Sequence, residues 1–445
     1  MSSLGLAVAA VLAATPITLE EVREASRHQL DAVRAQLDVD RAGAAKTQAK
    51  SAILPQVNLS AGTSIFFGGP QRRFSTVPVE GANGQVTFEQ RAVDTPGFVQ
   101  GNFQLGVSVN QLIYDGSRWW NQISLAGAQE EAAVGQLKEQ QLASELEAVR
   151  RFYELVRGQQ TLKVLQATRE RSQAQFERAK SLFEAGRVQK RDVLDAEVNV
   201  GNDRISVLRQ EQALVTAQAE LLSWLGRPSI EIEAVVPSGV TAPLTSSSVD
   251  QAATLTKAKQ HRPLFKSLDS RIRAAQLQVE MARADYFPSV SAQAAYQRQG
   301  PTADPFFTDP TKQNSLSAGV NLNWNLFNGF ATDSAVNRAR SDVTQADLQQ
   351  KQALAELESE LRRLIKAVSA QEAIAEVAHG NLSLAKTQLQ LEGDRYAAGA
   401  GSTIEVRNAE LKLLSAELTV VQSRVDVEVA RAALTRSVGA DLEKP

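Results

Sequence analysis

Four stretches of the chain alternate between apolar and uncharged polar residues over about ten positions each. In one of them, every second residue from Leu316 to Leu326 is apolar, and Ser, Gly or Asn fills the positions between. This period of two predicts β-strands with one apolar face and one polar face. The four strands are expected at about 56–67, 102–114, 289–298 and 315–327.

These strands lie in windows that contain no charged residue, although 22% of the chain is charged. The windows are Ser51–Gln71, Thr95–Tyr114, Tyr286–Gln297 and Gln313–Thr332. Aromatic residues gather around the same segments. A strand exposed to water would normally carry Lys, Glu or Arg on its polar face. Uncharged strands of this length with aromatic residues near their ends are typical of transmembrane β-strands. Buried hairpins in a soluble sandwich are the alternative.

If the four strands span a membrane, they cannot do so as one chain. Open sheet edges are not tolerated in lipid, and four strands are too few to close a barrel. The chain must then oligomerise, and three copies would supply twelve strands.

The segments between the strand pairs follow a helical period instead. Leu411, Leu414, Leu418, Val421 and Val425 are spaced three and four residues apart, as in a coiled-coil seam, and a second seam begins at Val198. No proline interrupts residues 117–182 or 330–395. A helix of this length would extend roughly 100 Å. A soluble coiled-coil scaffold would also explain the helices, but it would not explain the uncharged strands.

The chain repeats itself at a constant offset of 213 residues. Tyr114-Asp115-Gly116 corresponds to Phe327-Asn328-Gly329, and Ala196-Glu197 corresponds to Ala409-Glu410. Upstream of the strands the offset is larger by about twenty residues, which places an insertion between Gly68 and Gln100. The sequence therefore predicts a mixed fold of long helices and strands in two internal repeats. Its expected parts are a signal peptide at 1–14, a first repeat at 15–226, a linker at 227–249 and a second repeat at 250–445.

The signal peptide is expected because residues 2–19 carry no charge and Leu4–Ala14 is apolar and rich in alanine. This length suits the hydrophobic region of a secretory signal better than a membrane-spanning helix. An apolar N-terminal helix that frays is the alternative.

The composition argues against an enzymatic or metal site and against a nucleic-acid partner. The chain has no cysteine, which removes a disulfide scaffold, a cysteine metal site and an acylated N-terminal cysteine. Its three histidines are far apart in sequence and lack partners at metal-binding or nucleophilic spacing. A net charge of −2 gives no electrostatic reason to expect a nucleic-acid partner. We therefore expect no enzyme, no cofactor and no metal site.

At this point the residues resemble the TolC-like outer-membrane efflux proteins. The resemblance lies in the order of several short motifs over about 17–440. They are Ile17-Thr18-Leu19-Glu20-Glu21-Val22, Ile53-Leu54-Pro55-Gln56-Val57, Tyr286-Phe287-Pro288-Ser289-Val290, the two strand-to-helix motifs at 114–116 and 327–329, and His261-Arg262-Pro263. Leu264 departs from the family pattern, which has Asp after this proline.

The resemblance implies a homotrimer in the bacterial outer membrane that extends into the periplasm. It would combine a transmembrane β-barrel, four strands per protomer and twelve per trimer, with a long α-helical coiled-coil tunnel. Its partners would be outer-membrane lipid, a periplasmic adaptor (membrane fusion protein) and an inner-membrane transporter. The duct would passively conduct small molecules from the pump and adaptor to the exterior. The exit duct of a type I protein-secretion system is the alternative function.

Two turns between helices are expected to form the periplasmic tips that the adaptor grips. Glycine there permits a tight reversal with positive φ, so two ordinary helix ends would explain the same pattern. Arg187 and Ala400 depart from the residue that commonly follows the glycine in the family. The docking residues implied are Ala185, Gly186, Arg187, Ala398, Gly399 and Ala400.

Acidic residues follow each turn at a fixed distance. Asp192 and Glu405 stand six residues after the glycines, and Asp195 and its repeat equivalent Asn408 lie one helical turn further on. The resemblance implies that these four residues narrow the tunnel entrance as a periplasmic gate. Three copies would form a carboxylate ring, which attracts cations. The alternative is that the acids only stabilise helix N-termini.

Overall fold

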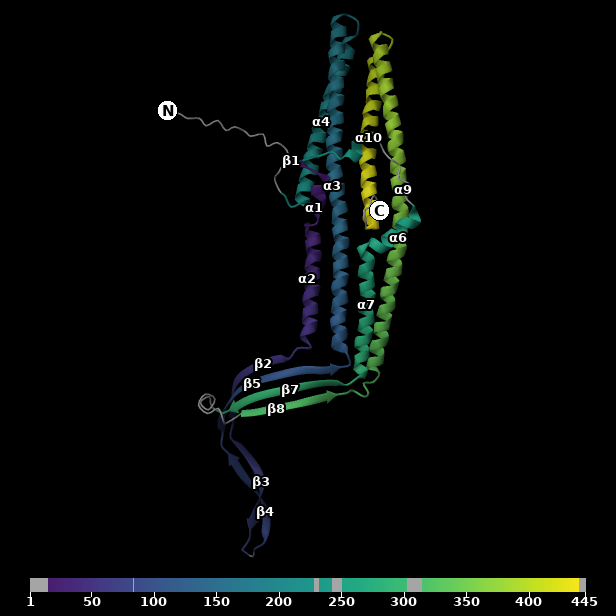
Figure 1. The fold of residues 1–445 in the computed structure, drawn as a ribbon. Helices are drawn as coiled ribbons and strands as arrows, with labels where there is room; N and C mark the ends of the chain where they lie inside the picture. The colour runs from purple at the N-terminus through teal and green to yellow at the C-terminus, as the bar shows by residue number, and fades with distance from the viewer. Residues whose placement is uncertain (1–14, 83, 228–231, 242–249, 302–313, 440–445) are drawn as a thin grey trace, which may run out of the picture. The chain divides into compact units, whose positions relative to one another are not determined.

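A computed structural model describes residues 15–82, 84–227, 232–241, 250–301 and 314–439. The signal peptide expected over residues 1–14 lies outside these ranges. The chain divides into two compact units (Figure 1). The helical unit comprises Met1–Ala42, Ala128–Ile272 and Thr344–Pro445, and the strand unit comprises Gly43–Gly127 and Arg273–Val343.

Helices dominate the described chain. They are α1 (Leu19–Ser26), α2 (Leu30–Ser51), α3 (Arg118–Glu184), α4 (Lys190–Trp224), α5 (Ser238–Thr241), α6 (Gln251–His261), α7 (Pro263–Arg283), α9 (Ala331–Ala397) and α10 (Thr403–Val438), with a 3-10 helix at Ala284–Tyr286. No helix in the described part of the chain is both long and apolar enough to cross a membrane.

In the described ranges, the strands form three small sheets. They are β1 (Thr15–Ile17), β2 (Gln56–Gly68), β3 (Gln71–Glu80), β4 (Val86–Thr95), β5 (Phe98–Asp115), β6 (Ile232–Ala234), β7 (Ser289–Gly300) and β8 (Asn314–Asn323). β1 pairs with β6 in parallel, β3 pairs with β4, and the four others form one antiparallel sheet in the order β2-β5-β7-β8.

The internal repeat is visible in the backbone. α3 and α9 each contain 67 residues, and their first residues are 213 positions apart. Glycines with left-handed φ recur at the same offset, in the pairs Gly116 and Gly329, Gly186 and Gly399, and Gly226 and Gly439. The sequence offset therefore reflects a repeated structural unit of strand, long helix, turn and helix.

The four-stranded sheet has one largely apolar face, whose charged residue in the described strands is Arg298 near the end of β7. Its register places Val57 opposite Val109, Val107 opposite Tyr296, and Ala292 opposite Val320. Because side chains alternate along every strand, these pairs extend one apolar surface across all four strands. The large side chains on this face are exposed in the single chain, Leu59 by 72% and Val320 by 68%. Water is a poor solvent for such a surface, whereas lipid is a suitable one.

The opposite face of this sheet is mainly polar, and its charged side chain in the described strands is Asp115 at the end of β5, opposite Ser289 of β7. It presents Asn, Ser, Gln and Gly from all four strands, for example Ser60 opposite Gly106, and Gln293 opposite Gly319. Within the described residues, β2 and β8 each pair with a single neighbour in this sheet. The sheet therefore ends in two open edges and is not a closed barrel in one chain.

The fourth strand is shorter than its alternating pattern suggested. It was expected to reach residue 327 but ends at Asn323. The indole Nε1 of Trp324 donates a hydrogen bond to the carbonyl of Tyr286, 3.1 Å away, and the chain then turns through Gly329 and Phe330, both with positive φ. The tertiary hydrogen bond and the turn end the pairing with β7, although the apolar alternation continues.

The insertion in the first repeat forms a hairpin that the alternation did not reveal. β3 and β4 pair along ten residues each, and Arg72 forms a bidentate ion pair with Asp94, with N–O distances of 2.7 and 3.1 Å. Charged residues are interleaved with the apolar ones here, so the segment lacks the uncharged signature of the other strands. The insertion is therefore a β-hairpin rather than an irregular loop.

The core of the helical unit also follows the repeat. One cluster surrounds Phe152 and Leu155 of α3 and Leu221 of α4, and another surrounds Leu361 of α9 and Leu434 of α10. Leu221 and Leu434 are 213 residues apart, and so are Ala148 and Leu361. α10 takes part in both clusters through Val425 and Leu434, so it joins the two repeats.

The linker expected over 227–249 is only partly described, and its described part is packed rather than free. Ile232, Ala234 and Val240 are buried in the first core cluster. Gln218 donates to the carbonyl of Ile232 at 2.7 Å, and Arg424 donates to that of Val240 at 2.7 Å. The burial of these three apolar residues packs the described part of the linker against the helices.

Candidate functional site at the helix turns

The two turns between long helices share one geometry. Gly186 (φ 69°) follows α3, and Gly399 (φ 78°) follows α9. In the first turn the Gly186 amide donates to the carbonyl of Phe183, and the Arg187 amide donates to that of Leu182, both at 2.8 Å. The same two bonds recur in the second turn at 3.0 and 2.9 Å. A left-handed glycine with these bonds satisfies the last carbonyls of each helix and reverses the chain.

The six candidate docking residues therefore occupy two equivalent turns. These residues are exposed, including the small Ala185 and Ala398 and the long, charged Arg187. A Cβ added at either glycine would have no other atom within 4 Å. Glycine is therefore needed at these positions for its positive φ and not for lack of space. The described chain thus provides the geometry that tip docking needs, whereas docking itself is a proposal.

The acids after the turns cap the helices that follow. The carboxylate of Glu405 accepts the Ser402 amide at 2.8 Å, and the Ser402 hydroxyl accepts the Glu405 amide at 3.3 Å. At α4, Asp192 accepts the Gln189 amide at 3.2 Å in the corresponding capping box. Each acid thus satisfies an otherwise free backbone donor. Both acids therefore stabilise the helix N-termini, as the alternative explanation expected. This capping role does not remove their negative charge.

The backbone amide of Ser402 lowers the pKa of the Glu405 carboxyl below its ordinary value. The hydrogen bond favours the ionised form, and the nearby Arg395 acts in the same direction. Glu405 therefore keeps its negative charge at every pH at which an ordinary glutamate is ionised.

The structure brings three of the four gate candidates together through the first turns of α4 and α10, whereas the described contacts of Glu405 are to its own helix start. The Thr403 hydroxyl donates to Asp192 at 3.2 Å, which links the first turn of α10 to that of α4. Asp195 and Asn408 line the same hollow of about 240 Å³, together with Asn199 and Thr403. Asp195 is half exposed, and its ion pair within the described ranges is a long contact of 3.7 Å to Arg191. Residues more than 200 positions apart thus form one polar region.

Beneath this region lies a buried ionic cluster that the sequence did not reveal. Arg407 of α10 makes two hydrogen bonds to Asp203 of α4, at 2.8 and 2.9 Å, and one to Glu410 at 3.3 Å. The hydroxyl of Ser172 on α3 contacts both Asp203 and Arg407. The cluster joins three helices across the two repeats.

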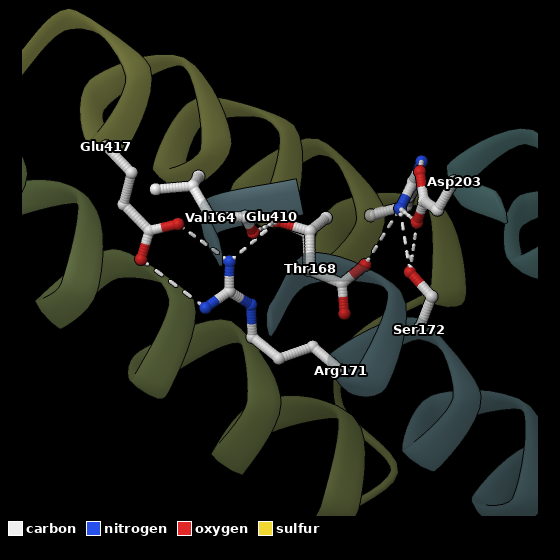
Figure 2. A network of polar contacts seen from close by, with 8 residues as sticks. Val164, Thr168, Arg171, Ser172, Asp203, Glu410 and Glu417 are labelled. Carbon is white, nitrogen blue, oxygen red and sulfur yellow. Dashed lines mark hydrogen bonds and ion pairs between the residues drawn. The ribbon is translucent and has the colours of Figure 1, made fainter. Parts of the chain in front are cut away.

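A second ion pair continues the cluster along α10. Figure 2 shows the carboxylate of Glu417 facing the guanidinium of Arg171, with the shorter N–O distance 2.8 Å. Arg171 also donates to the Thr168 hydroxyl at 2.9 Å, and that hydroxyl donates to the carbonyl of Val164. These contacts hold α10 against α3 just below the gate candidates.

The two acids around Arg407 are not equivalent. The hydrogen bonds that Arg407 donates to Asp203 raise the pKa of Arg407 further, so this guanidinium stays charged. Burial raises the pKa of the Glu410 carboxyl, although Arg407 pulls it in the other direction. Asp203 is thus the carboxylate that balances the charge of Arg407, and ionised Glu410 is costly where it lies. In sequence these residues look like ordinary solvated charges beside a heptad seam.

A family model described as outer membrane efflux protein matches residues 22–227 and 254–440, which is most of the chain. The chain belongs to the outer membrane efflux protein family. Members are channel proteins of the outer membrane, and this chain is therefore an outer-membrane protein that extends into the periplasm. The resemblance stated from the motifs is confirmed, as is the mixed fold of helices and strands.

Three relatives show the range of the family. TolC of Vibrio cholerae is 24% identical over 92% of this chain and 87% of its own length. CyaE of Bordetella pertussis is 27% identical over 69% of this chain and 64% of its own. The alkaline protease secretion protein AprF of Pseudomonas aeruginosa is 24% identical over 64% of this chain and 60% of its own. The chain thus spans somewhat less than two thirds of CyaE and of AprF.

Solved structures share the fold at low sequence identity. CusC matches with a TM-score of 0.77 and 15% identity, over 95% of this chain and 92% of its own. The CmeC outer membrane channel of Campylobacter jejuni matches with a TM-score of 0.75 and 15% identity, over 96% of this chain and 87% of its own. At such identities the likeness shows the fold, and the residues of the site must be argued from this chain.

Proposed function

We propose that the chain is one subunit of a trimeric exit duct that passively conducts small molecules out of the cell in a tripartite efflux system. The observation that carries this proposal is the four-stranded sheet with a largely apolar exposed face, a polar face that is uncharged except for Asp115 at the end of β5, and two open edges. Open edges are not tolerated in lipid, so the edges must pair with other copies. Three copies give twelve strands around a polar lumen.

The helices support the same assembly. Val198, Ile205 and Leu208 form the seam expected on α4, and in the single chain they are 62, 47 and 54% exposed. A helix that leaves a regular apolar seam uncovered needs a partner for it. A neighbouring copy in a helical tunnel would cover this seam.

The polar region after the turns would form the periplasmic entrance of the duct. Three copies of Asp192, Asp195 and Glu405 would surround the pore axis with carboxylates, and Asn408 would add amide groups. Such a ring attracts cations and repels anions. The partners would be a periplasmic adaptor at the turns and an inner-membrane transporter that supplies the energy, so the duct itself would need no cofactor and perform no catalysis.

Protein secretion is a second candidate. The similarity to AprF, which is named an alkaline protease secretion protein, supports it. The same duct would serve either function, because a wide water-filled passage needs no tight substrate pocket. The two candidates differ in the pump and adaptor that the duct receives.

The substitution Ile205→Glu is expected to break the trimer. It would bury three symmetry-related carboxylates at the helix seam, and burying unpaired charges costs several kcal/mol for each ion. Native mass spectrometry of the detergent-solubilised protein measures the result, and the trimer fraction should fall at least tenfold.

The matched control is Asn202→Glu, which adds the same charge to an exposed position of α4 outside the seam. This variant should remain a trimer. A trimer that survives Ile205→Glu as well as it survives the control would contradict the proposed assembly.

A further inference from the structure

The two helix turns share their backbone geometry but not their charge. Residues 178–191, around the first turn, contain five basic residues and one acid. The equivalent residues 391–404, around the second turn, contain one basic residue and two acids. The two turns have the same backbone conformation but side chains of opposite net charge. They therefore present two different surfaces to a partner.

The basic residues of the first turn are available for binding. Arg187 and Lys190 are exposed, and neither forms an ion pair with another residue in the described ranges. Arg191 is 70% exposed and makes only the 3.7 Å contact with Asp195. Their equivalents in the second turn are the uncharged residues 400, 403 and 404.

The single basic residue of the second turn is already occupied. Arg395 forms an ion pair with Glu392 at 3.0 Å and donates to the carbonyl of Ala400 at 3.5 Å. It therefore stabilises its own turn, whereas the first turn presents its cations to solvent.

Apolar side chains accompany the cations of the first turn. Phe183, in the last turn of α3, is 41% exposed, and Leu194, in the second turn of α4, is 50% exposed. The repeat equivalent of Phe183 is Tyr396, which is only 7% exposed. An exposed aromatic and a leucine within a rim of cations is a composition typical of a protein-binding surface.

We infer that the first turn docks an acidic helical hairpin of the periplasmic adaptor, and that the second turn docks a hairpin segment without that acidic character. This inference rests on the proposed function and adds the chemistry of the partner. Unpaired cations at close spacing repel each other, and carboxylates of the partner would remove that repulsion and steer its approach. In a trimer, basic and non-basic tips would alternate, so each adaptor hairpin would have one correct site.

Site-specific photo-crosslinking in the producing bacterium tests the inference. A benzoylphenylalanine at Ala185 reports on the first turn, and one at Ala398 reports on the second. Both positions are exposed alanines 213 residues apart. Mass spectrometry of the products should place Asp and Glu within about one helical turn of the residues crosslinked to 185, and not of those crosslinked to 398. Neutral or basic partner residues at 185 would overturn the inference.

Charge reversal provides the second arm. Arg187→Glu with Lys190→Glu should reduce both the crosslink at Ala185 and cellular export at least tenfold, and changing the partner's acids to Lys should restore them. An acid at Lys190, the first residue of α4, suits a helix N-terminus, so the variant should fold. The control is Lys163→Glu with Arg169→Glu, the same charge change on exposed residues of α3. Equal losses in both variants, or no loss in either, would overturn the inference.

Conductance separates this inference from the proposed function. The tip variant should still add discrete conductance steps to a planar bilayer, because its substitutions leave the strands of the proposed barrel unchanged. If the crosslinking and charge-reversal results contradict the inference while the wild type conducts, then only the acidic character of the partner is refuted. If the wild type does not conduct, the proposed function itself fails.

Discussion

Replacing Asp192 with Asn and Glu405 with Gln is expected to abolish the block of ionic current by multivalent cations applied from the periplasmic side. Three copies of the chain would lose six carboxylate charges from the pore entrance. Asn and Gln keep a carbonyl oxygen that can accept the capping hydrogen bonds of Gln189 and Ser402. The variant thus removes the charge and retains the helix starts.

Planar bilayer recording measures this effect as the cation concentration that halves the current. We expect that concentration to rise at least tenfold. The control Glu211→Gln with Glu220→Gln removes the same charge from exposed positions elsewhere on α4 and should leave the block unchanged. An unchanged block in the Asp192 and Glu405 variant would show that these acids serve only as caps.

The same block should persist into mildly acidic solution. Because the Ser402 amide lowers the pKa of Glu405, the carboxylate is ionised above that lowered value and is protonated only as the pH falls through it. An ordinary glutamate titrates at about 4.3, so the block by Glu405 should be retained at pH 5. Its loss between pH 7 and pH 5 would be inconsistent with the capping hydrogen bond.

Asp203→Asn is expected to destabilise the helical unit strongly, by about 3–5 kcal/mol. It removes the bidentate carboxylate from Arg407 and leaves a buried guanidinium without its counter-charge. Glu410→Gln should have the opposite or no effect at neutral pH, because burial raises the pKa of Glu410 and its ionised form is costly. The two variants change one acid each around the same arginine.

Thermal unfolding followed by circular dichroism distinguishes them. The unfolding midpoint should fall by several degrees in Asp203→Asn and should stay level or rise in Glu410→Gln. A raised acid pKa means that the cost of ionisation grows as the pH rises through it. The advantage of Glu410→Gln should therefore shrink as the pH falls below the ordinary glutamate range. Equal destabilisation by both variants would contradict the unequal roles of the two acids.

Local patterns in the sequence were sufficient for the four strands of the large sheet and for the long helices. An uncharged alternation of apolar and polar residues extends over most of β2 and over residues 289–297 of β7, so each strand could be recognised without its neighbours. The offset of 213 residues then predicted equivalent turns at Gly186 and Gly399, and both have positive φ. These features depend on residues that are close in sequence.

Features that depend on distant residues could not be predicted. The end of β8 is set by a hydrogen bond between Trp324 and Tyr286, 38 positions apart. The Arg407 cluster joins residues 204 and 235 positions apart, and its members have the same types as solvated charges on a helix. The hairpin of β3 and β4 was missed because charges interrupt its alternation.

Single-channel recording of the purified wild-type protein, combined with its native mass, tests most directly whether three copies form a duct. We expect the protein to fractionate with the outer membrane, to have three times the mass of its mature chain, and to add discrete cation-selective conductance steps to a planar bilayer. A protein that is soluble without detergent, is a monomer or dimer, and adds no current would contradict the trimeric duct.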